Sequence, residues 1–388
     1  MGVPARTPAG EPTVTFSFPG RSKKEFDARV EADLELIAKS LEGEFPGRIE
    51  ALVLVGSFGR GEGTMVVKGG EICPVHDYDI VAVTKDELPH EKVLYIAADL
   101  ASKLGLPSLD LFAYRKSQLG AFGLSLFSLD MKSSGYVFYG DSSVLDLIKP
   151  QDPAKLPIDE ARRLLFHRLP SLLECVQEGD FHRDVDGEDA FRIAYMSSKV
   201  ILAAVEALLI EAGDYHPSYR ERETRFLERH KRHARLGGLV QAATAIKLRG
   251  RIPEGFDAVR YWLWARRFYL STLFRVVCRS YETPLADWWD LASFYDRWLY
   301  FFVRKAWNRV FNRAKYAEWV AIQRRVKLEL AEIFLELARE SRTRVRAPYL
   351  AAARDFLTAV TGEKAPMDWE EARRLAVEWD YRILHPHG

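Results

Sequence analysis

The 388-residue chain has few cysteines, no long unbroken apolar run and no excess of either charge. Its three cysteines, Cys73, Cys175 and Cys278, stand roughly a hundred residues apart, which fits neither a disulfide framework nor a paired C-x-x-C metal site. No window reaches the roughly 18 consecutive apolar residues of a membrane-spanning helix. Residues 1–20 carry Pro and Gly where a signal peptide needs an apolar core. These absences predict a cytoplasmic protein with no membrane partner.

The charges of the chain nearly cancel, because 56 basic and 55 acidic side chains leave a formal charge of +1. No global electrostatic field therefore favours nucleic acid or a membrane surface, although a local basic face is compatible with this balance. With 48% hydrophobic residues and 12% aromatic residues, a chain of this length can fill the cores of about two domains.

The N-terminal third carries the alternating elements of a small α/β unit. Residues 1–21 are expected to be a flexible tail, and apolar residues at steps of three and four from Ser22 predict a helix with Gly43 as its C-cap. A second helix is predicted over 91–104. Short apolar runs rich in β-branched or aromatic residues predict strands at 49–57, 79–84, 109–115 and 134–140.

After Pro150 the strand-like alternation gives way to helical periodicity that continues to the C-terminus. Residues 188–212 carry apolar side chains along one side, and Gly213 follows as a stop signal. Capping boxes begin further helices at Ser218 and Asp368. The intervening region of about 255–341 also has a helical pattern.

These patterns predict an α+β protein. A small mixed-sheet domain is expected over residues 22–150 and a larger all-α helical domain over 151–388, with a subdivision near residue 250 as an option.

The glycine-rich stretch "LVGSFGRGEG", residues 54–63, follows an apolar run directly. A Walker A loop needs Lys and then Ser or Thr after its last glycine, whereas Glu62 follows Gly61 here, and the glycine spacing also misses G-x-G-x-x-G. Taken alone, the stretch predicts only a tight turn after a strand.

Two aspartates downstream give this turn a second interpretation. Asp77 and Asp79 are two residues apart at the start of a predicted strand, so their side chains project from the same face. Asp110 lies within another predicted strand. If the two strands are neighbours, the three carboxylates meet at one edge, where they can share hard cations.

These residues resemble the DNA polymerase β-like nucleotidyltransferase superfamily, whose pattern is an apolar strand, Gly-Ser, a short helix, Asp-x-Asp on the next strand and a later third carboxylate. The matches are Gly56-Ser57, Asp77-x-Asp79 and Asp110, and the resemblance covers about residues 25–148. The gap of 20 residues from Ser57 to Asp77 exceeds the usual dozen or so, and a predicted hairpin over 64–75 accounts for the excess.

The resemblance implies a metal-dependent transfer of a nucleotide. Two Mg²⁺ ions, with Mn²⁺ as the alternative, would neutralise the triphosphate and orient the acceptor hydroxyl. Asp77 and Asp79 would hold both ions, and Asp110 would hold the one that activates the acceptor. The nucleotide substrate would be an NTP, with ATP favoured.

Phosphate contacts are expected from both domains. Gly56, Ser57 and the backbone of the glycine turn would hold the β and γ phosphates, and Arg60 is a candidate for an additional contact. In the helical domain, Lys199 and Arg168 are further candidates, although a basic side chain at a helix edge more often only reaches solvent.

Other residues have simpler interpretations that stay open. Cys73 and His76 have C-x-x-H spacing, but no second pair supports a zinc site, and Asp130 is expected to cap a helix or turn. The segment 213–235 concentrates aromatic and basic residues that could line an acceptor cleft: Tyr215, Tyr219, Arg220, Arg222 and Arg225. A stripe with RNA-binding spacing, Lys305, Arg309 and Arg313, is more often a solvated helix face.

We therefore expect a nucleotidyltransferase that moves a nucleoside monophosphate from an NTP to an acceptor hydroxyl. The balanced charge favours a small-molecule acceptor, such as a sugar or an aminoglycoside-like compound. An RNA 3′ end or a protein hydroxyl is the alternative acceptor. The alternative from another class is a nucleotide-binding regulatory or antitoxin-like module on the same fold.

Overall fold

The computed structural model describes residues 23–68, 71–75, 77–106, 108–295, 297 and 313–384. It has the predicted α+β class, with 65% of residues in helices and 10% in strands. The predicted tail, His76, Lys305 and Arg309 lie outside the described residues, and so does the side chain of Arg313.

The chain forms two compact units. The first comprises Met1–Gly123, Phe127–Pro150 and Leu248–Gly250. The second comprises Leu124–Leu126, Gln151–Lys247 and Arg251–Gly388.

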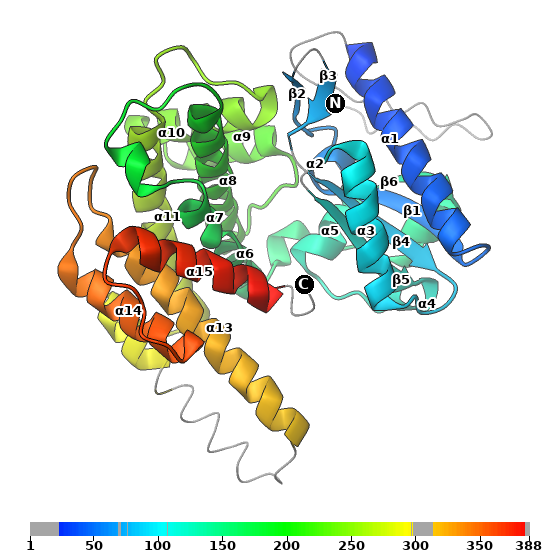
Figure 1. Ribbon diagram of the computed structural model, residues 1–388. Coiled ribbons are helices and arrows are strands. Elements are labelled where there is room, and N and C mark those ends of the chain that lie inside the picture. The colour runs from blue at the N-terminus through cyan, green and yellow to red at the C-terminus, as the bar shows by residue number, and fades with distance from the viewer. Residues whose placement is uncertain are drawn as a thin grey trace. The chain divides into compact units, whose positions relative to one another are not determined.

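The first unit is built on a four-stranded mixed sheet with the order β5-β4-β1-β6 (Figure 1). Strands β4 and β5 are parallel, whereas β1 is antiparallel to both β4 and β6. A separate hairpin pairs β2 with β3, as the sequence predicts for residues 64–75. The strands are β1 (Ile49–Val55), β2 (Met65–Lys68), β3 (Glu71–Pro74), β4 (Tyr78–Thr84), β5 (Leu109–Arg115) and β6 (Tyr136–Gly140).

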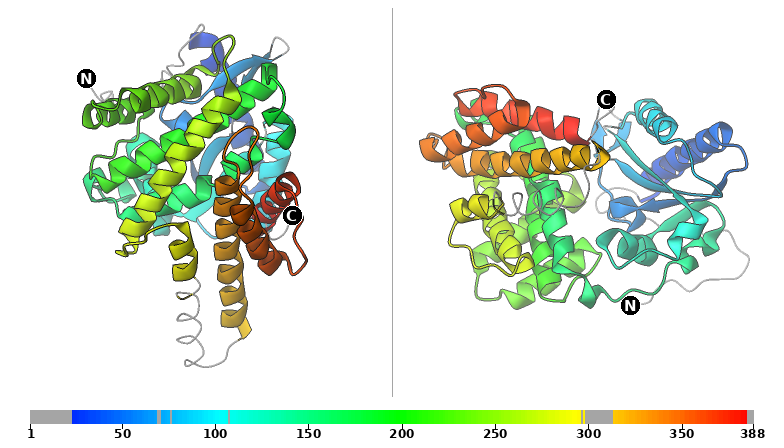
Figure 2. Two further views of the ribbon diagram at one scale, coloured as in Figure 1. Left: turned by 90° about the vertical axis from the view of Figure 1, so that its left-hand side faces the viewer. Right: turned by 90° about the horizontal axis from the view of Figure 1, so that it is seen from below.

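Helices cover both faces of this sheet (Figure 2, right). On one face, α1 (Lys23–Glu44) and α3 (His90–Leu104) bury their apolar sides against alternate strand residues such as Leu52 and Ile80. On the other face, α4 (Lys116–Leu119) and α5 (Leu126–Ser134) pack against the remaining residues, such as Val53 and Val81. The period of two along a strand divides the side chains between these two cores.

The first helix continues past Gly43, so the prediction that Gly43 is its C-cap is wrong. The helix ends at Glu44, and the amide of Phe45 still donates to the carbonyl of Leu41 at 2.9 Å. Phe45 is 2% exposed, so burial of its ring extends the helical path beyond the glycine. The left-handed backbone that usually marks a helix end occurs at Gly47, with a φ of 67°.

The second unit consists of helices. The central helix α8 (Gly187–Glu211) packs against both α6 and α11, and α13 lies alongside α14 and α15 (Figure 1). The remaining bounds are α6 (Ile158–Arg168), α7 (Pro170–Glu174), α9 (Tyr219–Arg229), α10 (Ala234–Arg249), α11 (Ala258–Ser280), α13 (Arg313–Ala338), α14 (Ala347–Thr361) and α15 (Trp369–Leu384).

The predicted helix ends of this unit are confirmed at three positions. The Ser218 side chain accepts from the amide of Glu221, and the Asp368 side chain accepts from the amide of Glu371 at 2.9 Å. Gly213 follows α8 with a φ of 65°. Helix α8 is long and apolar enough to cross a membrane, but 78% of its most apolar window is buried inside the protein, as in the core helix of a folded domain.

Candidate metal and nucleotide site

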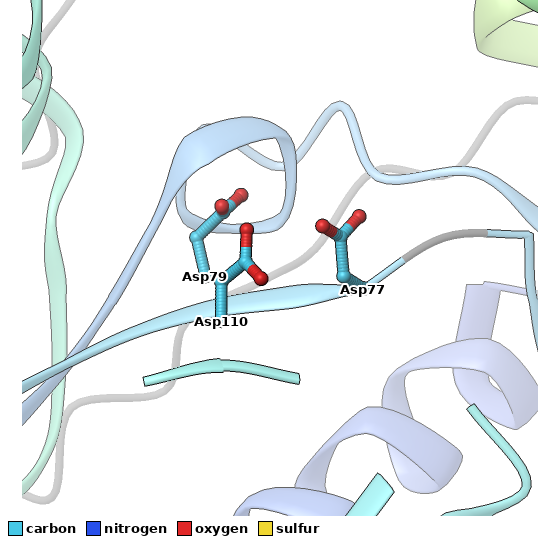
Figure 3. A group of neighbouring side chains, drawn as sticks. All are labelled: Asp77, Asp79 and Asp110. Atoms are coloured by element: carbon cyan, nitrogen blue, oxygen red, sulfur yellow. The ribbon is translucent and has the colours of Figure 1, made fainter. Parts of the chain in front are cut away.

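Three aspartates of the first unit converge at one edge of the sheet (Figure 3). Asp79 on β4 is directly opposite Asp110 on the parallel strand β5, and Asp77 immediately precedes β4. One carboxylate oxygen from each residue lies within 4.8 Å of the other two. The condition set by the sequence is therefore met, because the two strands are neighbours and the three carboxylates lie together.

The alternation of the strands decides which face of the sheet carries the carboxylates. Tyr78 and Ile80 belong to the core under α1 and α3, whereas Val81 belongs to the opposite core. Since successive side chains alternate, Asp79 lies on the face away from α1. Leu109 and Leu111 point into the α1 core, so Asp110 lies on the same face as Asp79.

Tyr78 fixes the strand between the two aspartates. Its side chain is fully buried, its ring meets Phe58 edge-on with centroids 4.7 Å apart, and its hydroxyl donates to Asp33 Oδ2 at 2.8 Å. Arg29 also bonds Asp33, with its Nε 2.8 Å from Oδ1. Burial raises the pKa of Asp33 even though both partners stabilise its charge. The start of β4 is thus held from the face opposite the aspartates.

The glycine turn passes directly over Asp79. Gly56 begins the four-residue helix α2 (Gly56–Gly59) with a φ of 65°. A Cβ at this position would lie 2.0 Å from Asp79 Oδ2, so a side chain here would force the Asp79 carboxylate to move. Gly56 therefore allows the backbone of the turn to approach the carboxylate closely.

The later glycines have structural roles in the turn. A Cβ on Gly59 would lie 2.5 Å from the carbonyl oxygen of Leu54, and one on Gly63 would lie 2.3 Å from the ring of Phe58. Gly61 has a φ of 69° with open space around it. Close packing and backbone conformation thus explain these three positions without a ligand.

Part of the expected phosphate cradle is used inside the protein. The amide of Gly56 donates to Asp130 Oδ2 at 3.0 Å, and the amides of Gly61 and Glu62 donate to carbonyls within the turn. Asp130 on α5 therefore acts as a cap, as expected, but it caps a turn 74 residues away in sequence. Ser57 is half-buried in α2, and its role as a phosphate contact stays a prediction.

Arg60 forms an ion pair rather than extending into solvent. Its Nη1 donates to Asp130 Oδ1 at 2.6 Å, and its Nε lies 3.7 Å from Glu62 Oε2. The Arg60 side chain is 13% exposed. The arginine holds α2 against α5, and a phosphate contact would have to share its guanidinium with Asp130.

The candidate cations of the helical unit lie in a charged interior. Lys199 on α8 and Arg168 on α6 both lower the pKa of Glu174, although burial of Glu174, the larger effect, raises its pKa overall. Lys199 is half-buried. Its role in binding phosphate stays a prediction.

The segment 213–235 is held by contacts within itself and with α8. Arg222 is 2% exposed, pairs with Glu206 and has its guanidinium 4.4 Å from the centre of the Tyr219 ring. Arg225 donates a hydrogen bond to Asp214 Oδ1 at 3.0 Å.

The sequence did not indicate a buried lysine, Lys247, which is 3% exposed and whose Nζ donates to the Tyr195 hydroxyl at 2.5 Å. Nothing in local sequence pairs residues 52 positions apart.

The donor set suits hard divalent cations. A Mg²⁺ ion binds oxygen at about 2.0–2.1 Å, so two of its ligand atoms lie at most about 4.2 Å apart. The three carboxylate oxygens lie within 4.8 Å of one another, which is close enough for them to share divalent cations. All three carboxylates are at least partly exposed, which leaves room for water and phosphate oxygens.

Comparison with known proteins adds no relative to this picture. No protein-family model and no curated protein matches the chain.

Proposed function

We propose that the protein is a Mg²⁺-dependent nucleotidyltransferase that transfers a nucleoside monophosphate from an NTP to an acceptor hydroxyl. The observation that carries this proposal is the convergence of Asp77, Asp79 and Asp110 within 4.8 Å beside the Gly56 turn, which approaches Asp79 closely. Carboxylates concentrated beside a glycine turn offer metal ligands and a nearby site for a triphosphate.

Each residue has a defined part in this proposal. Asp77 and Asp79 would hold both metal ions, and Asp110 would hold the one that activates the acceptor hydroxyl and would accept the proton of that hydroxyl. Ser57 contacts the terminal phosphates. Divalent ions, when bound, supply the positive charge that offsets the triphosphate and the leaving pyrophosphate.

The test is pyrophosphate release with NTP and Mg²⁺ in the presence of a panel of hydroxyl acceptors. Asp79→Asn should lower the rate at least about 100-fold, because a carboxylate that orients reacting groups contributes several kcal/mol to catalysis. The matched control is Asp99→Asn, which removes an exposed carboxylate that pairs with Lys103 on α3 and should leave the rate unchanged.

The outcome also separates the alternatives. Equal rates for wild type and Asp79→Asn would reject the site. Mg²⁺-dependent NTP binding without turnover on any acceptor would favour a regulatory module. Turnover on RNA that falls steeply with salt would favour RNA over the small-molecule acceptor proposed here.

A further inference from the structure

A second concave surface lies on the opposite side of the sheet from the aspartates. It is a groove of about 730 Å³ between α1 and the edge strand β6. One wall carries the aromatic side chains of Tyr136, Phe138 and Tyr139, and the other carries three acids, Glu31, Glu35 and Glu42, and one base, Lys39. The groove thus combines aromatic rings with acidic side chains.

A β-bulge creates the aromatic wall. Val53 pairs with Val137 and Leu52 pairs with Tyr139, so Phe138 is an extra residue on β6. A bulge redirects the side chains that follow it. As a result, Tyr136, Phe138 and Tyr139 all pack on the α1 side, whereas regular alternation would turn Tyr139 to the other face together with Val137.

The acidic wall has its charges at two separated points. Glu31 and Glu42 are eleven residues apart, which is close to three turns, so they lie on one side of α1 about 16 Å apart along its axis. Glu35 lies between them and pairs with Lys39 at 3.8 Å. Glu31 and Glu42 therefore provide the negative charge at the two ends.

Each of these two end glutamates lies beside a tyrosine. Burial and the charge of Glu31 raise the pKa of Tyr136, and burial and the neighbouring Glu42 raise that of Tyr139. Glu42 Oε1 accepts from the amide of Gly47 at 2.8 Å, which holds its carboxylate in place. Both ends of the groove thus have an acid next to an aromatic ring.

We propose that this groove binds a linear aliphatic polyamine. An ammonium group at each end would meet Glu31 and Glu42, and the methylene chain between them would lie on the aromatic wall. Carboxylates and aromatic faces both attract organic cations, whereas an anion would be repelled and a bare metal ion would gain nothing from the rings. The proposal is independent of nucleotidyl transfer, because it concerns the opposite face of the sheet.

The test is isothermal titration of the full-length protein with spermine, spermidine and putrescine at low salt. Spermine should bind most tightly, because only the longest of the three reaches both glutamates. The double variant Glu31→Gln and Glu42→Gln should weaken spermine binding at least about tenfold, since each lost charge-assisted contact is worth more than a neutral one. Glutamine still has an oxygen to accept from Gly47, so the fold should persist.

Three controls make the result specific. Glu87→Gln removes an exposed carboxylate outside the groove and should leave binding unchanged. Asp79→Asn should also bind spermine normally, and lost binding in that variant would place the cation at the aspartates and overturn the proposal. Tyr139→Leu tests the aromatic wall without changing a charge, and should weaken spermine binding. It keeps the proposal testable if the double variant does not fold.

Other results would also reject the polyamine. These are wild-type affinity in the double variant, equal affinity for putrescine and spermine, or a lysine-rich peptide that binds more tightly than spermine and displaces it. The last result would identify the groove as a site for a basic protein segment.

Discussion

Gly56 must lack a side chain for two separate reasons. Its φ of 65° is a left-handed backbone conformation, which costs an L-residue roughly 1–2 kcal/mol. Its missing Cβ also makes room for Asp79 Oδ2, which would otherwise lie at 2.0 Å. The second reason links this glycine to the carboxylate site, whereas the first applies to many turns.

Comparison with Gly61 separates the two effects. Gly61 has a similar φ of 69° but has open space where a Cβ would lie. Gly61→Ala should therefore lower the free energy of unfolding by about 1 kcal/mol and leave Mg²⁺ affinity unchanged. Gly56→Ala should destabilise the fold more and weaken Mg²⁺ binding at least about tenfold, because Asp79 must move. Chemical denaturation and Mg²⁺ titration measure both quantities, and equal Mg²⁺ affinity in the two variants would contradict this account.

At the scale of elements, α1 holds the start of β4 through a buried polar contact. The Tyr78 hydroxyl bonds Asp33 on α1, and Arg29 on the same helix donates to the carbonyls of Ile72 and Leu104. These bonds connect α1 to the hairpin, to the end of α3 and to β4. Because Tyr78 lies between Asp77 and Asp79, its anchoring limits how far the two carboxylates can move.

Tyr78→Phe tests this anchor. Loss of the hydroxyl leaves Asp33 buried with one hydrogen-bond donor fewer, so the free energy of unfolding should fall by about 1–2 kcal/mol. The control is Tyr95→Phe on α3, where the ring is 73% exposed and the change should be within about 0.5 kcal/mol. Similar midpoints for the two variants in urea denaturation would show that the bond to Asp33 does not stabilise the fold.

The elements were more predictable from sequence than the contacts between them. Period-two and helical patterns predict the strands, the hairpin and α8, because burial of one face imposes them locally. Asp79 and Asp110 meet only because β4 and β5 are adjacent in the sheet. The sequence did not show whether these two strands are neighbours, so it gave their meeting only as a condition. Long-range bonds gave no signal in advance, such as Asp130 to the amide of Gly56 across 74 residues. The prediction of a C-cap at Gly43 was wrong because burial of Phe45 outweighed the local propensity of the glycine.

At the scale of the whole molecule, the near-zero net charge does not show that the helical unit buries ionisable groups. Glu332 and Glu336 on α13 are fully buried. Among the residues that the structure describes, neither carboxylate has a hydrogen-bond partner. A buried carboxylate without partners is favoured in its neutral form, so the stability of this unit depends on keeping these protons.

The pH dependence of stability should reveal whether the buried Glu336 carboxyl keeps its proton. Burial raises the pKa of Glu336 to about 8, despite the opposing charges of Arg266 and Arg373, whereas its ordinary value is 4.5. Between these two values the unfolded chain releases the proton and the folded protein keeps it. The contribution of this group to stability is therefore fully present below about pH 4.5 and is lost as pH rises towards 8, by at most on the order of 5 kcal/mol.

Glu336→Gln should remove that loss, because an amide has no proton to release in this range. Unfolding measured from pH 5 to pH 9 should show a smaller fall in stability for the variant than for wild type, so the variant gains relative stability as pH rises. The matched control is Glu378→Gln on α15, an exposed position whose substitution should leave the pH profile parallel to wild type. Parallel profiles for Glu336→Gln as well would mean that Glu336 is ionised in the folded protein at neutral pH and that its charge is compensated there, with Arg266 and Arg373 as the facing cations.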